Sequence, residues 1–219
     1  MRSLRRPLAA LAVLAAVSSL AACSDDTDTG SEEAGGVSCD FAEDPMGASK
    51  EVDPPSSRAT ETGAVSATIS TSIGDLAATL DADAAPCTVS SMVSLAEQGY
   101  FDGTTCHRLT TDPEFGVLQC GDPSGSGAGG PGYTVPDEIT GEETYPAGTL
   151  AMANTGQPDS GGSQFFICYV DTRLDPAYTV FGTIDAASIQ LVADVAAAGT
   201  VSGGVAPLTP VDISTVTIG

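Results

Sequence analysis

The alternation of apolar and polar positions predicts a β-rich domain from about residue 63 onwards. Apolar side chains alternate with polar ones along residues 65–69 and again along residues 76–80. The segment Ser72–Asp75 between them is rich in turn-forming residues, so the two stretches together predict a β-hairpin. Residues 211–218 alternate in the same way and predict a further strand. We therefore expect a fold whose core is formed mainly by a sheet.

Two segments show the helical spacing of apolar residues instead. The first begins at Pro86, a residue favoured in the first turn of a helix, and ends before Gly99. The second runs from Ser188 to about Ala198 and ends at Gly199. Many strands, only two helices and glycine-rich loops predict a mostly β fold. We expect a closed antiparallel barrel with helices over its openings.

The first 23 residues have the pattern of an export signal. Three arginines precede the apolar run Leu8–Leu20, which is too short to span a membrane and is followed by small residues. The sequence Leu20-Ala21-Ala22-Cys23 resembles a bacterial lipobox, in which the cysteine is diacylated and becomes the new N-terminus. We expect a signal peptide over residues 1–22 and a lipid on Cys23. The alternative is an ordinary secretory signal that is cut nearby and leaves Cys23 as a spare thiol.

Residues 23–62 are rich in serine, glycine, threonine, proline and acidic residues, with almost no apolar periodicity. This composition predicts a solvated, flexible tether between the lipid anchor and a globular domain over residues 63–219. Cys39 and Phe41 are the exception, and we expect them to attach the end of the tether to the domain.

The chain is strongly acidic, and its charge limits what it can bind. The 219 residues include 29 acidic and seven basic ones, which gives a formal net charge of −22. Such a surface repels phosphate backbones, so we expect no nucleic-acid partner. His107 is the only histidine, and the acidic clusters lack the spacing of a calcium-binding loop. We expect neither a metal nor a cofactor.

Five cysteines remain when the lipidated one is set aside. They are Cys39, Cys87, Cys106, Cys120 and Cys168. Cys168 lies in an apolar run and is expected to be a buried free thiol. The other four permit two disulfides, in three pairings, outside the cytosol. Strand alternation disfavours one pairing, because Cys106 and Cys120 point to opposite faces if Arg108 and Gln119 share a face.

A single cation near apolar residues is the most informative chemical feature of the domain. Arg108 and Gln119 lie in two candidate strands, so a hairpin would place a guanidinium and an amide on one surface. The apolar residues of Gln164–Ile167 would complete a pocket, in which an arginine is costly unless it has a function. We expect His107 to face the opposite way, into the core. The glycine-rich loop 122–132 lacks the lysine of a phosphate-binding loop and is expected to border the pocket.

Five segments of the domain resemble the cyclophilin family of peptidyl-prolyl isomerases. They occur in the family's order and at nearly the family's spacing, within a resemblance that covers residues 63–219. The segments are Phe101–Arg108, Gln119–Asp122, Met152–Asn154, Gly162–Ile167 and Val180–Gly182. The resemblance implies an eight-stranded antiparallel barrel with a helix at each end, and catalysis of rotation about X–Pro peptide bonds.

The resemblance also implies roles for individual residues. Arg108 corresponds to the catalytic arginine, and Gln119 to the glutamine that orients it and fixes the substrate. Other positions correspond to an edge whose backbone binds the peptide, to the border and walls of a proline pocket, and to a loop glycine beside the substrate. They are Ala153, Asn154 and Thr155 at the edge, Gln164, Phe166 and Leu174 at the border and walls, and Gly127 in the loop.

The sequence departs from the family pattern around this site. Three additional residues separate His107 from Gln119, which displaces the family's Phe-Met pair. Val117 stands in place of the methionine, and Gly116, preceded by Phe115, lies near the phenylalanine position. Arg173 stands where the family has a pocket tryptophan, and Tyr178 where it has a pocket histidine. Because the inhibitor cyclosporin depends on that tryptophan, we expect it to bind weakly here.

These observations predict a peptidyl-prolyl cis-trans isomerase that assists the folding of exported proteins. We expect a monomer, attached by its lipid to the outer face of the bacterial cell membrane, with proline-containing exported polypeptides as partners. The alternative is a proline-peptide binding module or holdase chaperone that keeps the groove but turns over poorly. The altered pocket residues favour this alternative, whereas intact Arg108, Gln119 and Phe166 argue against it.

Overall fold

The structure is a computed structural model that describes residues 35–219, which form one unit. The predicted signal peptide and Cys23 lie outside the described residues. Within residues 35–219, no helix combines the length and the apolar character needed to cross a membrane.

The helices are α1 (Pro86–Glu97) and α2 (Ala186–Ala198). The strands are β1 (Val37–Ser38), β2 (Glu43–Ala48), β3 (Arg58–Ala59), β4 (Ala64–Thr71), β5 (Gly74–Asp81), β6 (Thr104–Thr105), β7 (Arg108–Leu109), β8 (Val117–Cys120), β9 (Pro131–Tyr133), β10 (Thr149–Met152), β11 (Phe165–Cys168), β12 (Val180–Ile184) and β13 (Asp212–Ile218).

The predicted hairpin is confirmed as β4 and β5. Its register pairs Ile69 with Leu76 and Val65 with Leu80. Along β5, Leu76, Ala78 and Leu80 are buried while the residues between them are exposed, which is the alternation expected of a strand with one covered face. The hairpin therefore presents one apolar face to the core.

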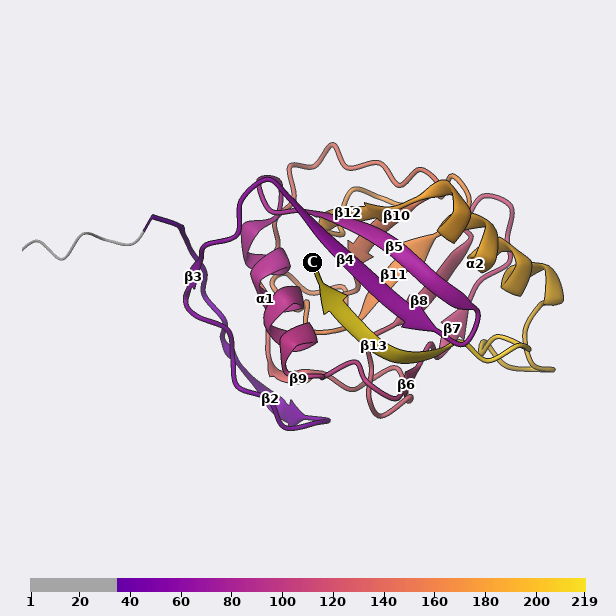
Figure 1. Ribbon diagram of the computed structural model, residues 1–219, viewed down its shortest axis with the longest axis horizontal. Helices are drawn as coiled ribbons and strands as arrows, with labels where there is room; N and C mark the ends of the chain where they lie inside the picture. The colour runs from indigo at the N-terminus through magenta and orange to yellow at the C-terminus, as the bar shows by residue number, and fades with distance from the viewer. Residues whose placement is uncertain (1–34) are drawn as a thin grey trace, which may run out of the picture. The chain divides into compact units, whose positions relative to one another are not determined.

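Both predicted helices are present, and they end where glycines follow. α1 begins at Pro86, and Gly99, with a φ of +64°, comes shortly after its end. α2 begins at Ala186, slightly earlier than predicted, because Asp185 caps it. The Asp185 carboxylate accepts a 2.8 Å hydrogen bond from the backbone N–H of Ser188. Figure 1 shows α1 and α2 beside opposite ends of the sheet.

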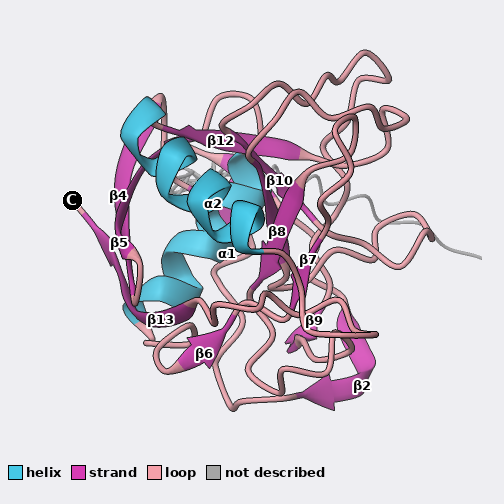
Figure 2. Cartoon of the chain, turned by 90° about the vertical axis from the view of Figure 1, so that its right-hand side faces the viewer, coloured by secondary structure: helices cyan, strands magenta, loops and turns pink. Residues whose placement is uncertain are grey.

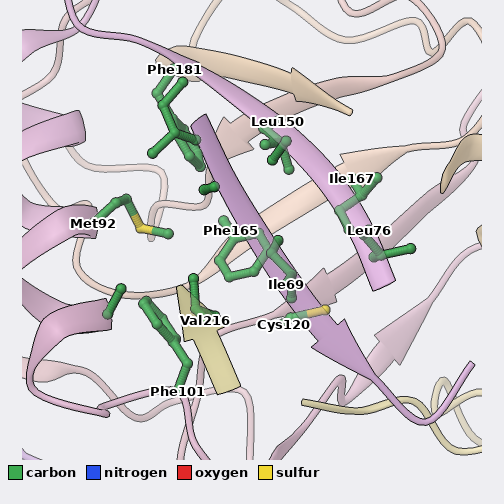
Figure 3. Close-up of a cluster of buried hydrophobic side chains, with 14 of the residues drawn as sticks. Ile69, Leu76, Met92, Phe101, Cys120, Leu150, Phe165, Ile167, Phe181 and Val216 are labelled. Carbon is green, nitrogen blue, oxygen red and sulfur yellow. The ribbon is translucent and has the colours of Figure 1, made fainter. Parts of the chain in front are cut away.

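The core lies between the inner face of the sheet and the two helices, and α2 contributes Val192 and Val195 to it. Met92 of α1 faces buried side chains of β11, β12 and β13, among them Phe165, Phe181 and Val216 (Figure 3). The ring of Phe165 meets those of Phe101 and Phe181 edge-on, with centroids 5.9 and 6.4 Å apart. These contacts hold β11 firmly, and β11 also carries residues of the site described below.

Nine strands form one sheet in the order β6-β13-β4-β5-β12-β10-β11-β8-β7 (Figures 1 and 2). The sheet is an open half-barrel, so the predicted closed barrel of eight strands is wrong in closure and in strand number. Its two edge strands, β6 and β7, have two residues each and are separated along the chain only by Cys106 and His107. In the described sheet β6 pairs with β13 and β7 pairs with β8, and no ladder joins β6 to β7.

Residues 35–62, predicted as part of a flexible tether, instead pack on the domain, and we call them the strap. β1 pairs with β3, β2 pairs with β9, and Cys39 forms a disulfide with Cys87 of α1. Phe41 meets Tyr133 edge-on, with ring centroids 5.7 Å apart. The expected attachment through Cys39 and Phe41 is present, but the packing extends along the strap. Its composition concealed this because a disulfide and strand pairing, rather than a periodic apolar face, hold it.

The second disulfide joins Cys106 and Cys120, the pairing that strand alternation disfavours. Arg108 and Gln119 do pair across β7 and β8, as that prediction assumes. However, Cys106 lies between β6 and β7 rather than inside a regular strand, and both cysteines are buried in the core. The prediction is wrong because the alternation is interrupted at His107.

Cys168 is a buried free thiol, as predicted. Burial raises its pKa to about 11. The thiol therefore stays protonated at neutral pH and packs as a small apolar group.

Candidate active site

A second apolar cluster lies apart from the main core. Its buried members are Val117, Tyr145, Ala151, Phe166 and Cys168, with Phe115, Ala153, Leu174, Tyr178 and Val180 packed against them. Every residue of β10 and β11 is buried, because alternate side chains enter the main core and this second cluster. Strands covered on both faces have continuous apolar sequences, which explains the runs around Ala151 and Phe166.

A cavity of about 120 Å³ opens over this cluster. All of its lining residues are predicted site residues: Arg108, Phe115, Val117, Gln119, Ala153, Asn154, Phe166, Leu174 and Tyr178. The remaining predicted residues, Gly127, Thr155 and Gln164, line an adjoining hollow of about 140 Å³ that shares Gln119, Ala153 and Asn154. Two larger hollows, of about 420 and 440 Å³, lie elsewhere, and Arg108 lines neither. We place the candidate site at the smaller cavity because it combines a cation with an apolar floor.

A chain of side-chain hydrogen bonds fixes the cation. Arg108 lies opposite Gln119 in the β7–β8 pair, and its Nη1 donates to Oε1 of Gln119 over 3.0 Å. The Gln119 amide donates to Oε1 of Gln164 over 2.9 Å, and Nε2 of Gln164 donates to the carbonyl oxygen of Gly129 over 2.9 Å. Each group is therefore oriented by the next, which restricts the guanidinium to one direction at the cavity.

Phe115 supplies an aromatic wall, and its ring faces the cation. The guanidinium carbon of Arg108 lies 5.5 Å from the ring centroid of Phe115. Position 116 cannot carry the aromatic wall, because it has no room for a side chain. A Cβ on Gly116 would lie 2.6 Å from a methyl carbon of Val170 and 2.8 Å from the ring of Tyr169. The turn before β8 therefore brings the ring of residue 115, rather than a side chain at 116, to the cavity.

Tyr145 is not among the predicted site residues, yet it packs against two residues that line the cavity, Phe166 and Tyr178. Its ring lies 6.3 Å from that of Phe166 and 6.2 Å from that of Tyr178, between centroids. Its hydroxyl accepts a 3.0 Å hydrogen bond from the backbone N–H of Tyr178 and lies 3.2 Å from the carbonyl oxygen of the same residue, to which it donates. Burial raises the pKa of Tyr145, which keeps the hydroxyl protonated. Tyr145 follows an acidic, glycine-containing stretch without apolar periodicity, so no local pattern marks it.

The loop that carries Gly127 is fixed by a buried carboxylate. Asp122 accepts hydrogen bonds from the backbone N–H groups of Ser124, Gly127 and Gly129 over 2.7, 2.7 and 3.1 Å. Burial by itself would raise the pKa of Asp122, but these hydrogen bonds outweigh burial and the pKa is lowered. Gly127 has a φ of +81°, which favours glycine at this turn.

His107 faces this loop rather than the core, so its predicted orientation is wrong. Its Cδ2 lies 3.4 Å from the place that a Cβ on Gly127 would occupy, and the residue is half-buried. Burial lowers the pKa of His107; Asp122 acts against this shift, and Arg108 reinforces it. The imidazole is therefore neutral at pH 7. Among the residues that line the cavity, Arg108 is the one with a charged side chain.

Arg173, at the family's tryptophan position, does not line the cavity. Its guanidinium forms a 2.9 Å ion pair with Glu114, and both side chains are exposed. The backbone N–H of Arg173 also donates to the Glu114 carbonyl oxygen over 2.7 Å. Arg173 therefore contributes no wall to the cavity.

Comparisons with known proteins point in one direction. The family model described as "Cyclophilin type peptidyl-prolyl cis-trans isomerase/CLD" matches residues 66–218. The chain is 44% identical over 197 residues to the Mycobacterium tuberculosis protein named "Probable peptidyl-prolyl cis-trans isomerase B", which covers 83% of this chain and 64% of that protein. It is 47% identical over 104 residues to "Peptidyl-prolyl cis-trans isomerase B" of Bacillus subtilis, covering 47% and 70%. The chain therefore spans less than two thirds of its mycobacterial relative.

Solved structures agree with the fold. A crystal structure of a Cryptosporidium parvum cyclophilin type peptidyl-prolyl cis-trans isomerase superposes with a TM-score of 0.63 at 28% identity, covering 71% of this chain and 98% of that one. A second crystal structure of that enzyme, in the presence of the dipeptide Ala-Pro, gives a TM-score of 0.62 at 28% identity, covering 70% and 98%. The strap precedes the residues that the family model matches.

Proposed function

This chain belongs to the cyclophilin-type peptidyl-prolyl cis-trans isomerase family, and from that premise we propose that it catalyses isomerisation of X–Pro bonds at the cavity below Arg108. One observation carries the proposal: the cavity combines a single oriented guanidinium with an apolar floor of the buried residues Val117 and Phe166. An X–Pro substrate requires both parts, since its ring is apolar and its amide nitrogen is the atom whose bonding changes.

The barrier to X–Pro rotation comes from amide resonance. It amounts to ~18–20 kcal/mol in ordinary peptide bonds, and X–Pro bonds exchange over tens to hundreds of seconds. In the twisted transition state, resonance is lost, the prolyl nitrogen becomes pyramidal and it gains a lone pair. A donor aimed at that lone pair has no partner in the planar ground states, so it binds the transition state preferentially.

Arg108 is the donor in this proposal. Gln119 fixes its direction and the ring of Phe115 supports it, so little reorganisation is required during rotation. The proline ring would lie against Phe166 and Val117, while the peptide backbone follows the edge Ala153–Thr155. A barrier lowered by ~7 kcal/mol corresponds to a rate about 10⁵-fold higher.

An isomerisation assay on the purified chain tests the proposal. A tetrapeptide with an Ala-Pro bond is followed by protease-coupled cleavage, or without protease by NMR exchange between its cis and trans signals. We expect acceleration proportional to protein concentration. Binding of the peptide without acceleration would contradict the proposal and would favour the binding-module or holdase alternative.

We also propose that the protein acts on exported, proline-containing polypeptides at the outer face of the membrane. The basic and apolar N-terminal pattern that ends at Cys23 supports this location. The disulfides Cys39–Cys87 and Cys106–Cys120 support it as well, since such bonds persist in oxidising compartments. A monomer remains our proposal for its oligomeric state.

A further inference from the structure

The strap contributes a carboxylate to the hollow beside the cavity. Asp44 of β2 lines this hollow together with Gln119, Ala153 and Asn154, which also line the cavity. β2 reaches this position because it pairs with β9, and Figures 1 and 2 both show the two strands together. Of the residues that line the hollow, Asp44 is the one with an ionisable side chain.

The carboxylate of Asp44 is held in place but keeps one oxygen for a ligand. Its Oδ1 accepts a 2.9 Å hydrogen bond from the N–H of Met46, and the residue is half-buried. Its Oδ2 faces the glycine loop, 3.9 Å from the place that a Cβ on Gly130 would occupy. Gly130 itself carries no side chain, so nothing from that position covers this oxygen.

The strap is fixed where it meets the loop. The N–H of Ser49 donates to the carbonyl oxygen of Gly130 over 2.8 Å, and the N–H of Gly130 donates to Oγ of Ser49 over 3.1 Å. The disulfide Cys39–Cys87 secures the strap on the other side of Asp44. Asp44 is therefore positioned before any ligand arrives, which reduces the entropy lost on binding.

The cations of this region are already engaged elsewhere. Lys50 donates to the backbone carbonyl oxygens of Gly99 and Tyr100, and Arg108 donates to Gln119. Asp122, behind the glycine loop, adds a second negative charge that is satisfied by backbone donors. Lys50 and Arg108 keep their charge, but within the described residues their donors are directed at carbonyl and amide oxygens and not at Asp44. Asp44 is the charged residue that lines the hollow itself, so a cationic ligand there would meet its carboxylate directly.

We propose that the hollow binds the side chain of a lysine or arginine close to the proline of the substrate, with Asp44 as the specificity-determining residue. The proposal rests on the proposed isomerase function and deepens it by naming a substrate class, cationic proline peptides. The strap precedes the residues that match the family model, so this carboxylate is an addition to the family domain.

Peptides that differ at one position test this proposal. Each peptide contains Ala-Pro. Lysine, norleucine or glutamate is placed at one of five positions, three before the alanine and two after the proline. The value of kcat/KM is measured for each peptide at low and at high salt. At one of these positions we expect kcat/KM for the lysine peptide to exceed that for the norleucine peptide by about fivefold, which corresponds to about 1 kcal/mol. High salt should reduce the ratio, because the charges are partly exposed.

Two variants with matched loss of charge locate the effect. In Asp44→Asn the preference for lysine over norleucine should disappear, so that the two peptides have about equal kcat/KM. Glu43→Gln should keep the preference. Glu43 is the neighbouring residue on β2, is exposed and does not line the hollow. Asp44→Lys should reverse the preference in favour of glutamate. Thermal unfolding of each variant verifies that the strap remains folded.

Three results would overturn the proposal: no position with a lysine preference, an unchanged preference in Asp44→Asn, or an equal loss in Glu43→Gln. Peptide Kd values from calorimetry separate this failure from that of the isomerase proposal. A lysine preference in Kd without turnover would leave the cationic subsite standing and contradict only the catalytic function.

Discussion

The guanidinium of Arg108 lies against the face of Phe115, with 5.5 Å from its central carbon to the ring centroid. Arg108 lies in β7 and Phe115 shortly precedes β8, so the turn between these two strands makes them neighbours. The aromatic wall and the cation are therefore in contact, and we expect a change in one to alter the position of the other.

Replacing Arg108 should remove most of the catalysis. Arg108→Ala is expected to lower kcat/KM by about 10²-fold or more, the range for loss of one donor to a transition state. Arg108→Lys should restore little, because an ammonium lacks the planar fork that Gln119 orients. Arg173→Ala is the matched control, since Arg173 lies outside the cavity and pairs with Glu114. Full activity in Arg108→Ala would refute the mechanism.

Replacing Phe115 should weaken the site by a smaller amount. Phe115→Leu keeps an apolar side chain but loses the cation–π contact, worth ~0.5–1 kcal/mol at a partly exposed position, and some of the buried area. We expect kcat/KM to fall about threefold to tenfold on these grounds. A fully active Phe115→Leu variant would show that the aromatic face of residue 115 does not support Arg108.

Gly116→Ala tests why the ring is at position 115. The added methyl group would meet Val170 and Tyr169, so we expect a loss of ~1–3 kcal/mol in the free energy of unfolding, as for an overpacked site. Urea titration measures this value. An alanine tolerated without loss would show that position 116 has room for a side chain.

Catalysis should be nearly independent of pH. Rotation transfers no proton, and an arginine keeps its charge throughout the neutral range, so no bell-shaped profile is expected. We predict that kcat/KM changes by less than about threefold between pH 6 and 9 on this basis. A sigmoidal rise that disappears in His107→Gln, while Arg108→Ala stays active, would contradict it.

Stability, in contrast, should depend on His107. Burial lowers its pKa below the ordinary value of 6.5, so the unfolded chain binds the proton more readily than the folded chain. The stabilisation is therefore complete above pH 6.5 and is lost as the pH falls below that value. Denaturant titrations at pH 7.5 and 5.5 should show a smaller decrease in the free energy of unfolding for His107→Gln than for the wild type. Equal decreases would assign the effect to other groups.

Cyclosporin should bind weakly, because Arg173 stands where the family has a tryptophan. The exposed guanidinium pairs with Glu114 and contributes no apolar wall to the cavity. Arg173→Trp should lower the Kd for cyclosporin, as measured by titration calorimetry. A wild-type Kd equal to that of tryptophan-containing relatives would contradict this prediction.

Cys23 should carry a lipid in cells that recognise the lipobox. Labelled fatty acid is expected to enter the wild-type protein and not Cys23→Ser. Equal labelling of both proteins would exclude the anchor and leave the ordinary secretory signal as the better interpretation.

The site could be predicted from the sequence because its residues belong to short segments whose order and spacing resemble the family. Local pattern was also sufficient for the β4–β5 hairpin and for α1, whose apolar periodicity, initial Pro86 and following Gly99 match the structure. Tyr145 could not be predicted as a residue that supports the site, because this role depends on hydrogen bonds to a loop that is distant in sequence.

The errors have a different origin. The Cys106–Cys120 disulfide and the orientation of His107 depend on a break in strand alternation between β6 and β7, and the sequence around His107 carries no marker of that break. Composition reports apolar burial and so predicts a tether for the strap, whereas Cys39 is held by a covalent bond to a residue 48 positions away.

β13 determines when this protein can fold. Residues 212–218 lie between β4 and β6 in the sheet, paired with both, so the earliest strand of the nine and the latest are direct neighbours. The sheet therefore cannot be completed until those residues have been synthesised, and its contact order is high, which is typical of slow-folding domains. We expect a nascent chain without residues 212–218 to remain open along β4, a state still loose enough to be threaded through an export channel.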